Sequence, residues 1–414
     1  MLDFTNYRLD NGLEVLVEKN KHAYSTSLGY FVNTGSRDEN DANWGVSHYL
    51  EHMLFKGSEN RSAEEVNTAI DRYGASCNAF TSEEHTVYYA TIIAEYQSEV
   101  TALLTDFMRP ALRSEDFEME KQVILEEIKK YEDQPPFGAY EKCMQKHFEG
   151  HYLGRSVLGT VESVTALTPE AMRDYFQKRY HPGNLVFVAT GNVDEKRLLE
   201  ELAKETESWK PRESSRHLAR HQGSGGFASI VKKEATQQYL LQVSNGPAAS
   251  DNDRYAARLL CTMLGDETGS RLYWQLVETG LAEYAVMGAY EYQDTGLLFT
   301  YLSCRPEEGE KNWESLAQIQ NEVASTGFQE EELQRAKSKY CSHLAIQAEK
   351  SGNRMFQVGN NWLQRGCYVP LPESLSKYQG VTLEEVQAVF ADHPLQENTV
   401  LSVGPREIQA PTTC

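Results

Sequence analysis

The last part of the chain repeats an order of elements that also occurs near its middle. Thr382 precedes a helix-forming stretch, His393-Pro394 follows it, and the apolar run 399–404 comes next. Residues 167–191 show the same order around His181-Pro182. A repeated helix–strand unit predicts two similar tandem domains, with chance similarity between two short units as the alternative. A chain of 414 residues is long enough to give each domain its own core.

Strand and helix patterns are mixed along the chain. Asn11-Gly12 lies between two short apolar runs, which predicts a β-hairpin, and Thr168-Pro169 is typical of a helix start. The stretch 210–226 is polar and rich in Gly, Ser and Arg, so we expect it to connect the domains. We therefore predict an α+β fold with two similar tandem domains, residues 1–209 and 227–414, each a mostly antiparallel sheet packed with helices.

The run from Val46 to Phe55 contains the pattern His-x-x-Glu-His. On a helix, His48 and His52 lie on one face because they are four residues apart, and Glu51 lies at the edge of the same site. Two imidazoles on one helix face can share a metal ion, and the neighbouring carboxylate can act as a general base. The pattern makes a zinc peptidase the leading hypothesis.

Spacing alone is weak evidence in a chain with eleven histidines. The pairs His147/His151 and His217/His221 have the same interval. Gly150 argues against a continuous helix through the first pair, and the second pair lies in a polar, Arg-rich stretch without a suitably placed carboxylate. We expect no metal at either pair, whereas the first motif combines a carboxylate with apolar neighbours, and a polar cluster buried among them needs a purpose.

A catalytic zinc ion usually has three protein ligands and an open position for water. The acidic stretch from Phe117 to Ile128 has apolar residues at helical spacing, which places Glu120 and Glu127 two turns apart on one side. Glu127 is a candidate third ligand, and Glu120 a candidate for its support. Taken alone, this stretch is more typical of an ordinary solvated acidic helix.

These motifs, in this order, resemble the M16 (insulinase, or pitrilysin) metallopeptidases and the mitochondrial processing peptidases. Further stretches also match the family: Gly35-Ser36-Arg37-Asp38-Glu39, Met53-Leu54-Phe55-Lys56-Gly57, Asn78 to Tyr89 and Tyr180 to Leu185. The resemblance implies one Zn²⁺ per chain on His48, His52 and Glu127. It also implies that Glu51 is the general base and that Glu120 steadies a metal ligand.

The resemblance also implies how a peptide is bound. Asn78, Ala79, Phe80 and Thr81 resemble the family's edge strand, to which an extended peptide adds by main-chain hydrogen bonds. Unfolded peptides are therefore the expected substrates. A plain sheet edge is the alternative interpretation of this stretch.

The second half departs from the family pattern at one position. Its run Ser270-Arg271-Leu272-Tyr273 is usually followed by an Arg and then a Tyr that contact the peptide. Tyr284 lies at the expected place and is a candidate substrate-binding residue, or else a core aromatic, but Val277 occupies the Arg position. Small family members resemble half of a clamshell, so we expect a homodimer, or a heterodimer with a related subunit that supplies the missing Arg.

Composition and charge exclude several classes of protein and of binding partner. The net charge of −21 disfavours nucleic acid, whose phosphates would be repelled. No apolar run is long enough for a membrane span, and the first residues lack the pattern of a secretory leader, so we expect a cytoplasmic protein. The seven cysteines are scattered and without a C-x-x-C pair, so we expect reduced thiols. We predict a zinc endopeptidase, with a non-catalytic or partner-dependent subunit of a heteromeric complex as the alternative.

Overall fold

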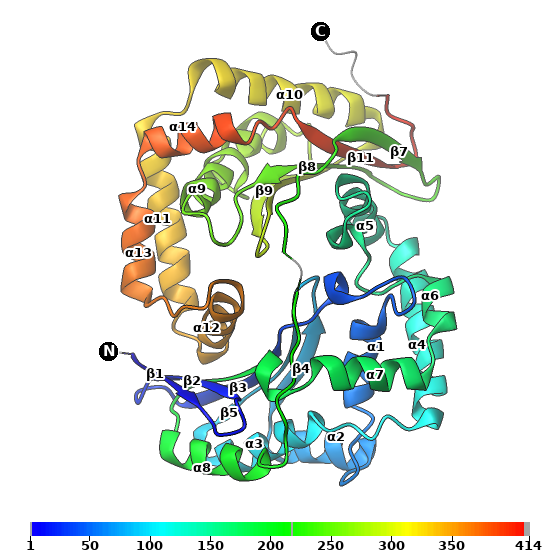
Figure 1. The fold of residues 1–414 in the computed structure, drawn as a ribbon. Helices are drawn as coiled ribbons and strands as arrows, with labels where there is room; N and C mark the ends of the chain where they lie inside the picture. The colour runs from blue at the N-terminus through cyan, green and yellow to red at the C-terminus, as the bar shows by residue number, and fades with distance from the viewer. Residues whose placement is uncertain (1, 217, 410–414) are drawn as a thin grey trace. The chain divides into compact units, whose positions relative to one another are not determined.

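The computed structural model describes residues 2–216 and 218–409, which form two β-sheets with helices on their faces (Figure 1). By their contacts these residues divide into two units. The first unit comprises residues 1–129, 155–217 and 347–368, and the second unit comprises residues 130–154, 218–346 and 369–414.

The first unit is built on a sheet in which one strand pair, β2 and β6, is parallel and the other pairs are antiparallel. In spatial order its strands are β1 (Asp3–Arg8), β2 (Glu14–Lys19), β6 (Leu185–Gly191), β3 (Ser25–Val32), β5 (Thr86–Ile93) and β4 (Ser76–Thr81). The predicted hairpin at Asn11-Gly12 is confirmed, since β1 pairs with β2 and Gly12 has a φ of +90°. Strand β4 lies at the edge.

Helices of the first unit cover both faces of this sheet. They are α1 (Val46–Leu54), α2 (Ala63–Arg72), α3 (Gln97–Phe107), α4 (Ser114–Asp133), α6 (Val161–Ala166), α7 (Pro169–Arg179), α8 (Glu195–Glu205) and α12 (Ser351–Arg365). Alternate residues of β3 face opposite sides: Tyr30 hydrogen-bonds Thr105 of α3, whereas Phe31 packs against Phe356 of α12. Figure 1 shows α3 and α12 on opposite faces of the sheet.

The sheet of the second unit repeats this topology with one strand fewer. In spatial order its strands are β7 (Gly226–Val231), β11 (Asn398–Gly404), β8 (Gln238–Gly246), β10 (Gly296–Cys304) and β9 (Tyr284–Glu291), and β7 with β11 is its parallel pair. Its helices are α5 (Pro135–His147), α9 (Arg254–Gly265), α10 (Gly309–Thr326), α11 (Glu330–Gln347), α13 (Leu371–Gly380) and α14 (Leu383–Asp392).

The predicted repeat is visible in the structure. Thr168 accepts a hydrogen bond from the Ala171 N–H at the start of α7, and Thr382 accepts one from Glu385 at the start of α14. Each helix leads into a strand, β6 or β11, that is parallel to one neighbour and antiparallel to the other. The prediction of two similar tandem α+β domains is confirmed.

The packing units exchange helices between the two halves of the chain. Helix α5 comes before the 210–226 stretch in sequence but packs on β8 and β11, and α12 comes after it but packs on β3 and β6. Gly359 allows α12 to approach the sheet closely, because a Cβ there would lie 2.4 Å from the Phe31 ring. The domain limits 1–209 and 227–414 remain a prediction. Nothing in the sequence predicted that α5 and α12 pack in the opposite unit.

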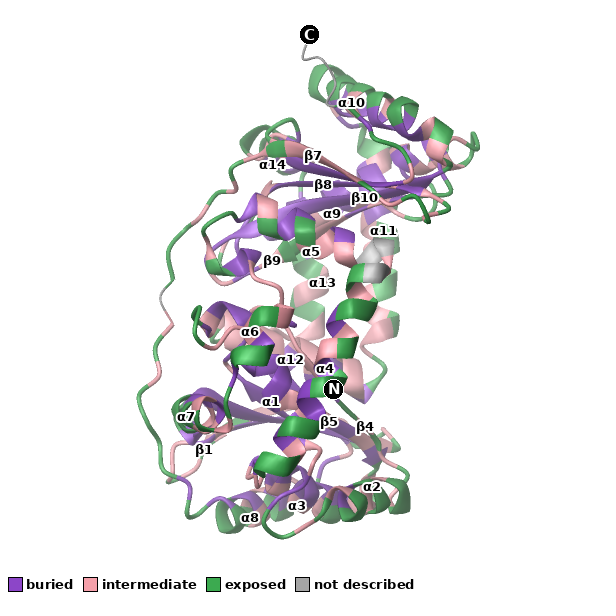
Figure 2. Ribbon diagram, turned by 90° about the vertical axis from the view of Figure 1, so that its right-hand side faces the viewer, coloured by how far each residue is buried: buried purple, intermediate pink, exposed green. Residues whose placement is uncertain are grey.

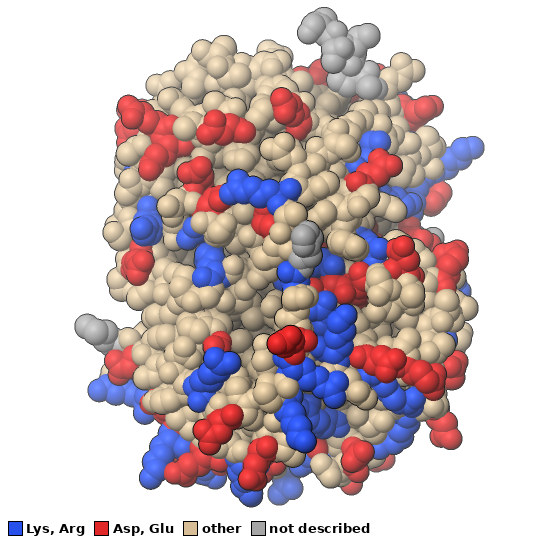
Figure 3. Space-filling view, viewed as in Figure 1, with Lys and Arg blue, Asp and Glu red and all other residues tan. Residues whose placement is uncertain are grey.

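Buried and charged residues are distributed as the fold requires. Figure 2 shows buried residues along the strands and exposed residues on the outer sides of α2 and α8. On the face seen in Figure 3, acidic and basic side chains are interspersed. No helix in the described part of the chain combines the length and the apolar character needed to cross a bilayer. The cysteines described there are free thiols.

Candidate metal centre

Helix α1 carries His48, Glu51 and His52, and its start is tightly specified. Gly45 precedes the helix with a φ of +90°, a conformation that favours glycine. The buried Glu39 carboxylate accepts hydrogen bonds from the backbone N–H groups of Gly45 and Ser47, both at 2.7 Å. A carboxylate at this position satisfies free N–H groups of the first turn. Burial raises the pKa of Glu39 to about 8, and the two amide donors oppose that rise.

Helix α4 brings a third donor to the two histidines. Tyr49 of α1 stacks on Phe117 of α4, with ring centroids 4.5 Å apart. Nearly three turns further along α4, the Glu127 Oε2 lies 3.8 Å from the His48 Nε2 and 3.6 Å from the His52 Nε2. The sequence-predicted residues His48, His52 and Glu127 therefore do come together.

The three donors lie close enough together to share one cation. Two ligands of a zinc ion at about 2.0 Å lie roughly 3.3 Å apart, and one ligand atom from each of these residues lies within 4.8 Å of the others. Burial, and then the neighbouring His52, lower the pKa of His48 to about 3, so its imidazole is neutral and able to bind a cation. Among the residues that the structure describes, no other group of three or more such side chains is arranged to hold a metal.

Glu120 contacts the opposite side of the His52 ring. Its Oε1 lies 2.8 Å from the His52 Nδ1, and its Oε2 lies 2.5 Å from the Lys56 Nζ. Burial opposes charge on His52, but the Glu120 hydrogen bond and the carboxylates of Glu127 and Glu51 raise its pKa. A carboxylate on Nδ1 fixes the tautomer that leaves Nε2 free for a metal. Glu120 therefore contacts the His52 ring, and its role in steadying a metal ligand stays a prediction.

Glu51 lies on α1 without belonging to the three-donor group. Its Oε2 accepts a hydrogen bond of 2.6 Å from the Thr81 hydroxyl. Burial raises the pKa of Glu51, although the Thr81 hydrogen bond opposes this. A carboxylate with a raised pKa is better suited to accept and release a proton near neutral pH. The sequence did not indicate this contact between Thr81 and Glu51.

The predicted peptide-binding residues lie on β4, which pairs with β5 on one side only. Asn78 is exposed, and Ala79 is buried with its N–H donating to the Asn78 side chain at 2.9 Å. The Phe80 ring packs 5.7 Å from the Phe356 ring of α12, so its side chain forms part of the core. The other main-chain edge of β4 has no partner strand among the described residues, and peptide binding there stays a prediction.

Tyr284 and Val277 both belong to the second unit. Tyr284 begins the edge strand β9, has 38% of its surface exposed, and donates a hydrogen bond of 2.8 Å to Glu267. It is a surface residue and not a core aromatic. Val277 ends a π-helical turn, Tyr273–Val277, and packs against the core of this unit. A role for Tyr284 in substrate binding stays a prediction.

His147, His151 and His221 belong to no group of three or more candidate metal ligands among the described residues. His147 is buried, with its Nδ1 3.0 Å from the Thr399 hydroxyl. His151 stacks on His221 with ring centroids 4.3 Å apart, a pairing that sequence spacing did not suggest. His217 lies outside the described residues.

Two family models match the chain. The model described as insulinase, peptidase family M16, matches residues 14–161, and the model described as the peptidase M16 inactive domain matches residues 166–340.

Relatives in the curated set carry the name uncharacterized zinc protease. One from Streptomyces coelicolor is 31% identical over 406 residues, which cover 96% of this chain and 88% of the relative. Another, YmxG from Bacillus subtilis, is 29% identical over 388 residues, which cover 92% of this chain and 94% of the relative. The similarity therefore extends over both halves of the chain.

Solved structures with the same fold are more distant in sequence. A protease from Helicobacter pylori matches with a TM-score of 0.91 and 20% identity, covering 98% of this chain and all of that chain (100%). A chain of complex III2 from Candida albicans matches with a TM-score of 0.85 and 19% identity, covering 97% of this chain and 96% of that chain. At these identities the likeness concerns the fold alone.

Proposed function

Because this chain belongs to the M16 (insulinase) family of peptidases, as its sequence motifs indicated, we propose that it is a zinc-dependent endopeptidase. The carrying observation is the convergence of His48, His52 and Glu127, with Glu51 beside them but outside the donor group. Its relatives are named zinc proteases, which supports one Zn²⁺ per chain.

In the proposed reaction, the metal ion and the protein side chains have different roles. A bound Zn²⁺ supplies Lewis acidity and lowers the pKa of a water molecule to about 7. His48, His52 and Glu127 would hold the ion, and Glu120 would steady the His52 ring through its contact with Nδ1. Glu51 accepts a proton from the attacking water and passes it to the leaving amine.

We propose extended, unfolded peptides as substrates. Strand β4 has one side unpaired in the sheet, so a peptide can add there through main-chain hydrogen bonds. Such binding selects for an extended backbone more than for particular side chains. The proposal includes Asn78, Ala79, Phe80 and Thr81 as the strand that receives the peptide, and Tyr284 as a further contact.

The proposed assembly is a dimer whose two chains enclose a chamber, in the cytoplasm. Val277 replaces an arginine of the family pattern, so a second copy or a related subunit is the proposed source of that contact. Nucleic acid is not a proposed partner, given the net charge of −21. A membrane is not proposed either, because no described helix is long and apolar enough to span one.

The proposal is tested by measuring zinc content and cleavage of a quenched peptide, with and without chelator. The Glu51→Gln variant should retain zinc and fold but lose hydrolysis by roughly 100-fold or more, because an amide cannot accept the proton. Full turnover by this variant would remove Glu51 from its role as general base.

A non-catalytic subunit of a heteromeric complex is the second candidate. The match to a chain of complex III2 concerns the fold, and the donor set His48, His52 and Glu127 is intact here, which favours the enzyme. Assay of the purified, zinc-loaded chain separates the two. Zinc binding without cleavage, followed by cleavage on adding a related subunit, would identify a partner-dependent enzyme.

A further inference from the structure

One residue of the predicted connecting stretch enters the first unit. Arg212, Glu213 and Ser215 are exposed, but the Arg216 side chain is only 7% exposed. The sequence pattern of this stretch predicts a solvated connection. A buried guanidinium in such a stretch therefore needs an explanation.

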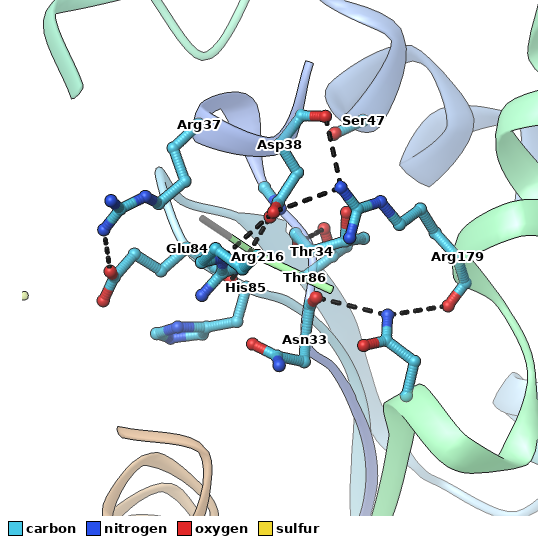
Figure 4. Close-up of polar contacts among 12 residues, drawn as sticks. Asn33, Thr34, Arg37, Asp38, Ser47, Glu84, His85, Thr86, Arg179 and Arg216 are labelled. Atoms are coloured by element: carbon cyan, nitrogen blue, oxygen red, sulfur yellow. Dashed lines mark hydrogen bonds and ion pairs between the residues drawn. The ribbon is translucent and has the colours of Figure 1, made fainter. Parts of the chain in front are cut away.

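Arg216 forms a bidentate pair with a buried aspartate through one edge of its guanidinium. Its Nε donates to the Asp38 Oδ1 at 3.0 Å, and its Nη2 donates to the Asp38 Oδ2 at 2.5 Å (Figure 4). The same Nη2 donates to the backbone carbonyl of Glu84 at 2.5 Å. Arg179 lies 3.3 Å from Asp38, whose side chain is 1% exposed. Arg216 thus joins two segments, one containing Asp38 and the other containing Glu84.

The first of these segments leads into the metal helix. Asp38 is followed directly by Glu39, whose carboxylate caps α1 through the N–H groups of Gly45 and Ser47. Ser47 immediately precedes His48. A displacement of the loop that contains Asp38 would therefore be transmitted to the start of the helix that carries the histidines.

The second segment is the turn after β4. Thr81, the last residue of β4, donates a hydrogen bond to Glu51. The Ser36 and Arg37 N–H groups donate to the carbonyls of Ser82 and Glu83, at 3.2 and 2.9 Å. Arg37 also pairs with the Glu84 carboxylate at 2.5 Å. Gly35 permits this close approach, because a Cβ there would lie 2.2 Å from the Ser82 carbonyl oxygen. The turn and the loop form one hydrogen-bonded unit that Arg216 spans.

We propose that Arg216 is a positioning residue for hydrolysis, which rests on the function proposed above. It fixes the loop before α1 to the turn that follows Thr81 at the end of β4. Because Thr81 hydrogen-bonds the Glu51 side chain, this sets the orientation of that side chain relative to His48 and His52. A planar, bidentate guanidinium constrains geometry in a way that a lysine cannot. A buried ion pair often adds little to stability compared with apolar packing, so geometric specificity is the more direct benefit of this contact.

The test compares Arg216→Ala with Arg220→Ala in the full-length, zinc-loaded chain. Arg220 lies in the same stretch and pairs with Asp251, but its side chain is 74% exposed, so it is a matched control. Arg216→Ala should lower kcat about tenfold or more, since small misplacements of reacting groups are costly. KM should change less than about twofold, because β4 remains paired with β5 along its whole length. Arg220→Ala should leave both constants unchanged.

A second readout does not depend on activity. Hydrogen exchange at the amides of Ser36, Arg37 and Ser47 should be faster in Arg216→Ala than in Arg220→Ala, with the rest of the first unit unchanged. Arg216→Lys, which keeps the charge without the bidentate geometry, should recover only part of kcat and of the protection.

The proposal is overturned if Arg216→Ala and Arg220→Ala have the same kcat and the same exchange. It is also overturned if Arg216→Lys is fully wild-type in both, because charge alone would then suffice. If Arg216→Ala does not fold, the Arg216→Lys comparison decides. If the wild-type chain itself cleaves no peptide, the proposed function fails, and the exchange comparison still decides whether Arg216 fixes the loop.

Discussion

Replacing Glu120 by alanine should weaken zinc binding without removing any of the three proposed ligands. The Glu120 carboxylate lies 2.8 Å from the His52 Nδ1 and 2.5 Å from the Lys56 Nζ, and its side chain is 6% exposed. Its loss frees the His52 ring from one tautomer and orientation and leaves the Lys56 ammonium without this partner. Removing such a partner of a ligating histidine costs roughly 10- to 100-fold in metal affinity. This corresponds to about 1.4 to 2.7 kcal/mol.

The assay is competition for zinc against a chromophoric chelator at neutral pH, and Glu118→Ala is the matched control. Glu118 lies on the same helix, but its side chain is 63% exposed and its cationic partner, Lys121, is 3.9 Å away. Glu120→Gln, which keeps an acceptor oxygen but not the charge, should lose less affinity than Glu120→Ala. Equal zinc affinity for Glu120→Ala and Glu118→Ala would refute the assignment of Glu120 as the support of His52.

Three further outcomes are expected. Glu127→Ala should lose bound zinc while Glu126→Ala, whose side chain is 73% exposed, retains it; equal zinc content by elemental analysis would exclude Glu127 as a ligand. Burial lowers the pKa of His85 to about 4, below its unfolded value of about 6.5, so its stabilising contribution is complete above pH 6.5 and declines toward pH 4. Urea unfolding of His85→Phe should show a weaker dependence on pH over this window, and an unchanged dependence would contradict the reasoning. A fragment of residues 1–209 should not fold by circular dichroism unless residues 347–368 are added, because α12 covers one face of its sheet.

The features that sequence alone determined are those with a local physical cause. The spacing of His48 and His52 places both on one helix face because the helix repeats every 3.6 residues. Asn11-Gly12 specifies a hairpin turn, and Thr168 and Thr382 specify helix starts, because each acts within a few residues. The duplicated topology was likewise visible as a repeated order of such local signals.

The third candidate ligand, Glu127, was determined partly by the sequence and partly by the tertiary structure. The helical spacing of apolar residues in α4 placed Glu120 and Glu127 on one side and made Glu127 a candidate ligand. The residues alone also left an ordinary solvated helix as the alternative, and the family resemblance is what favoured the metal site. The structure brings this face of α4 against α1, so that Glu127 meets both imidazoles and Glu120 meets His52.

Other features were decided by tertiary structure alone. Neither spacing nor composition predicted three of them: the exchange of α5 and α12 between sheets, the hydrogen bond from Thr81 to Glu51, and the insertion of Arg216 beside Asp38. Each joins segments far apart in the chain, and such contacts depend on which surfaces are buried together rather than on the preferences of neighbouring residues. Sequence periodicity specifies the face that a helix presents, and packing specifies what that face meets.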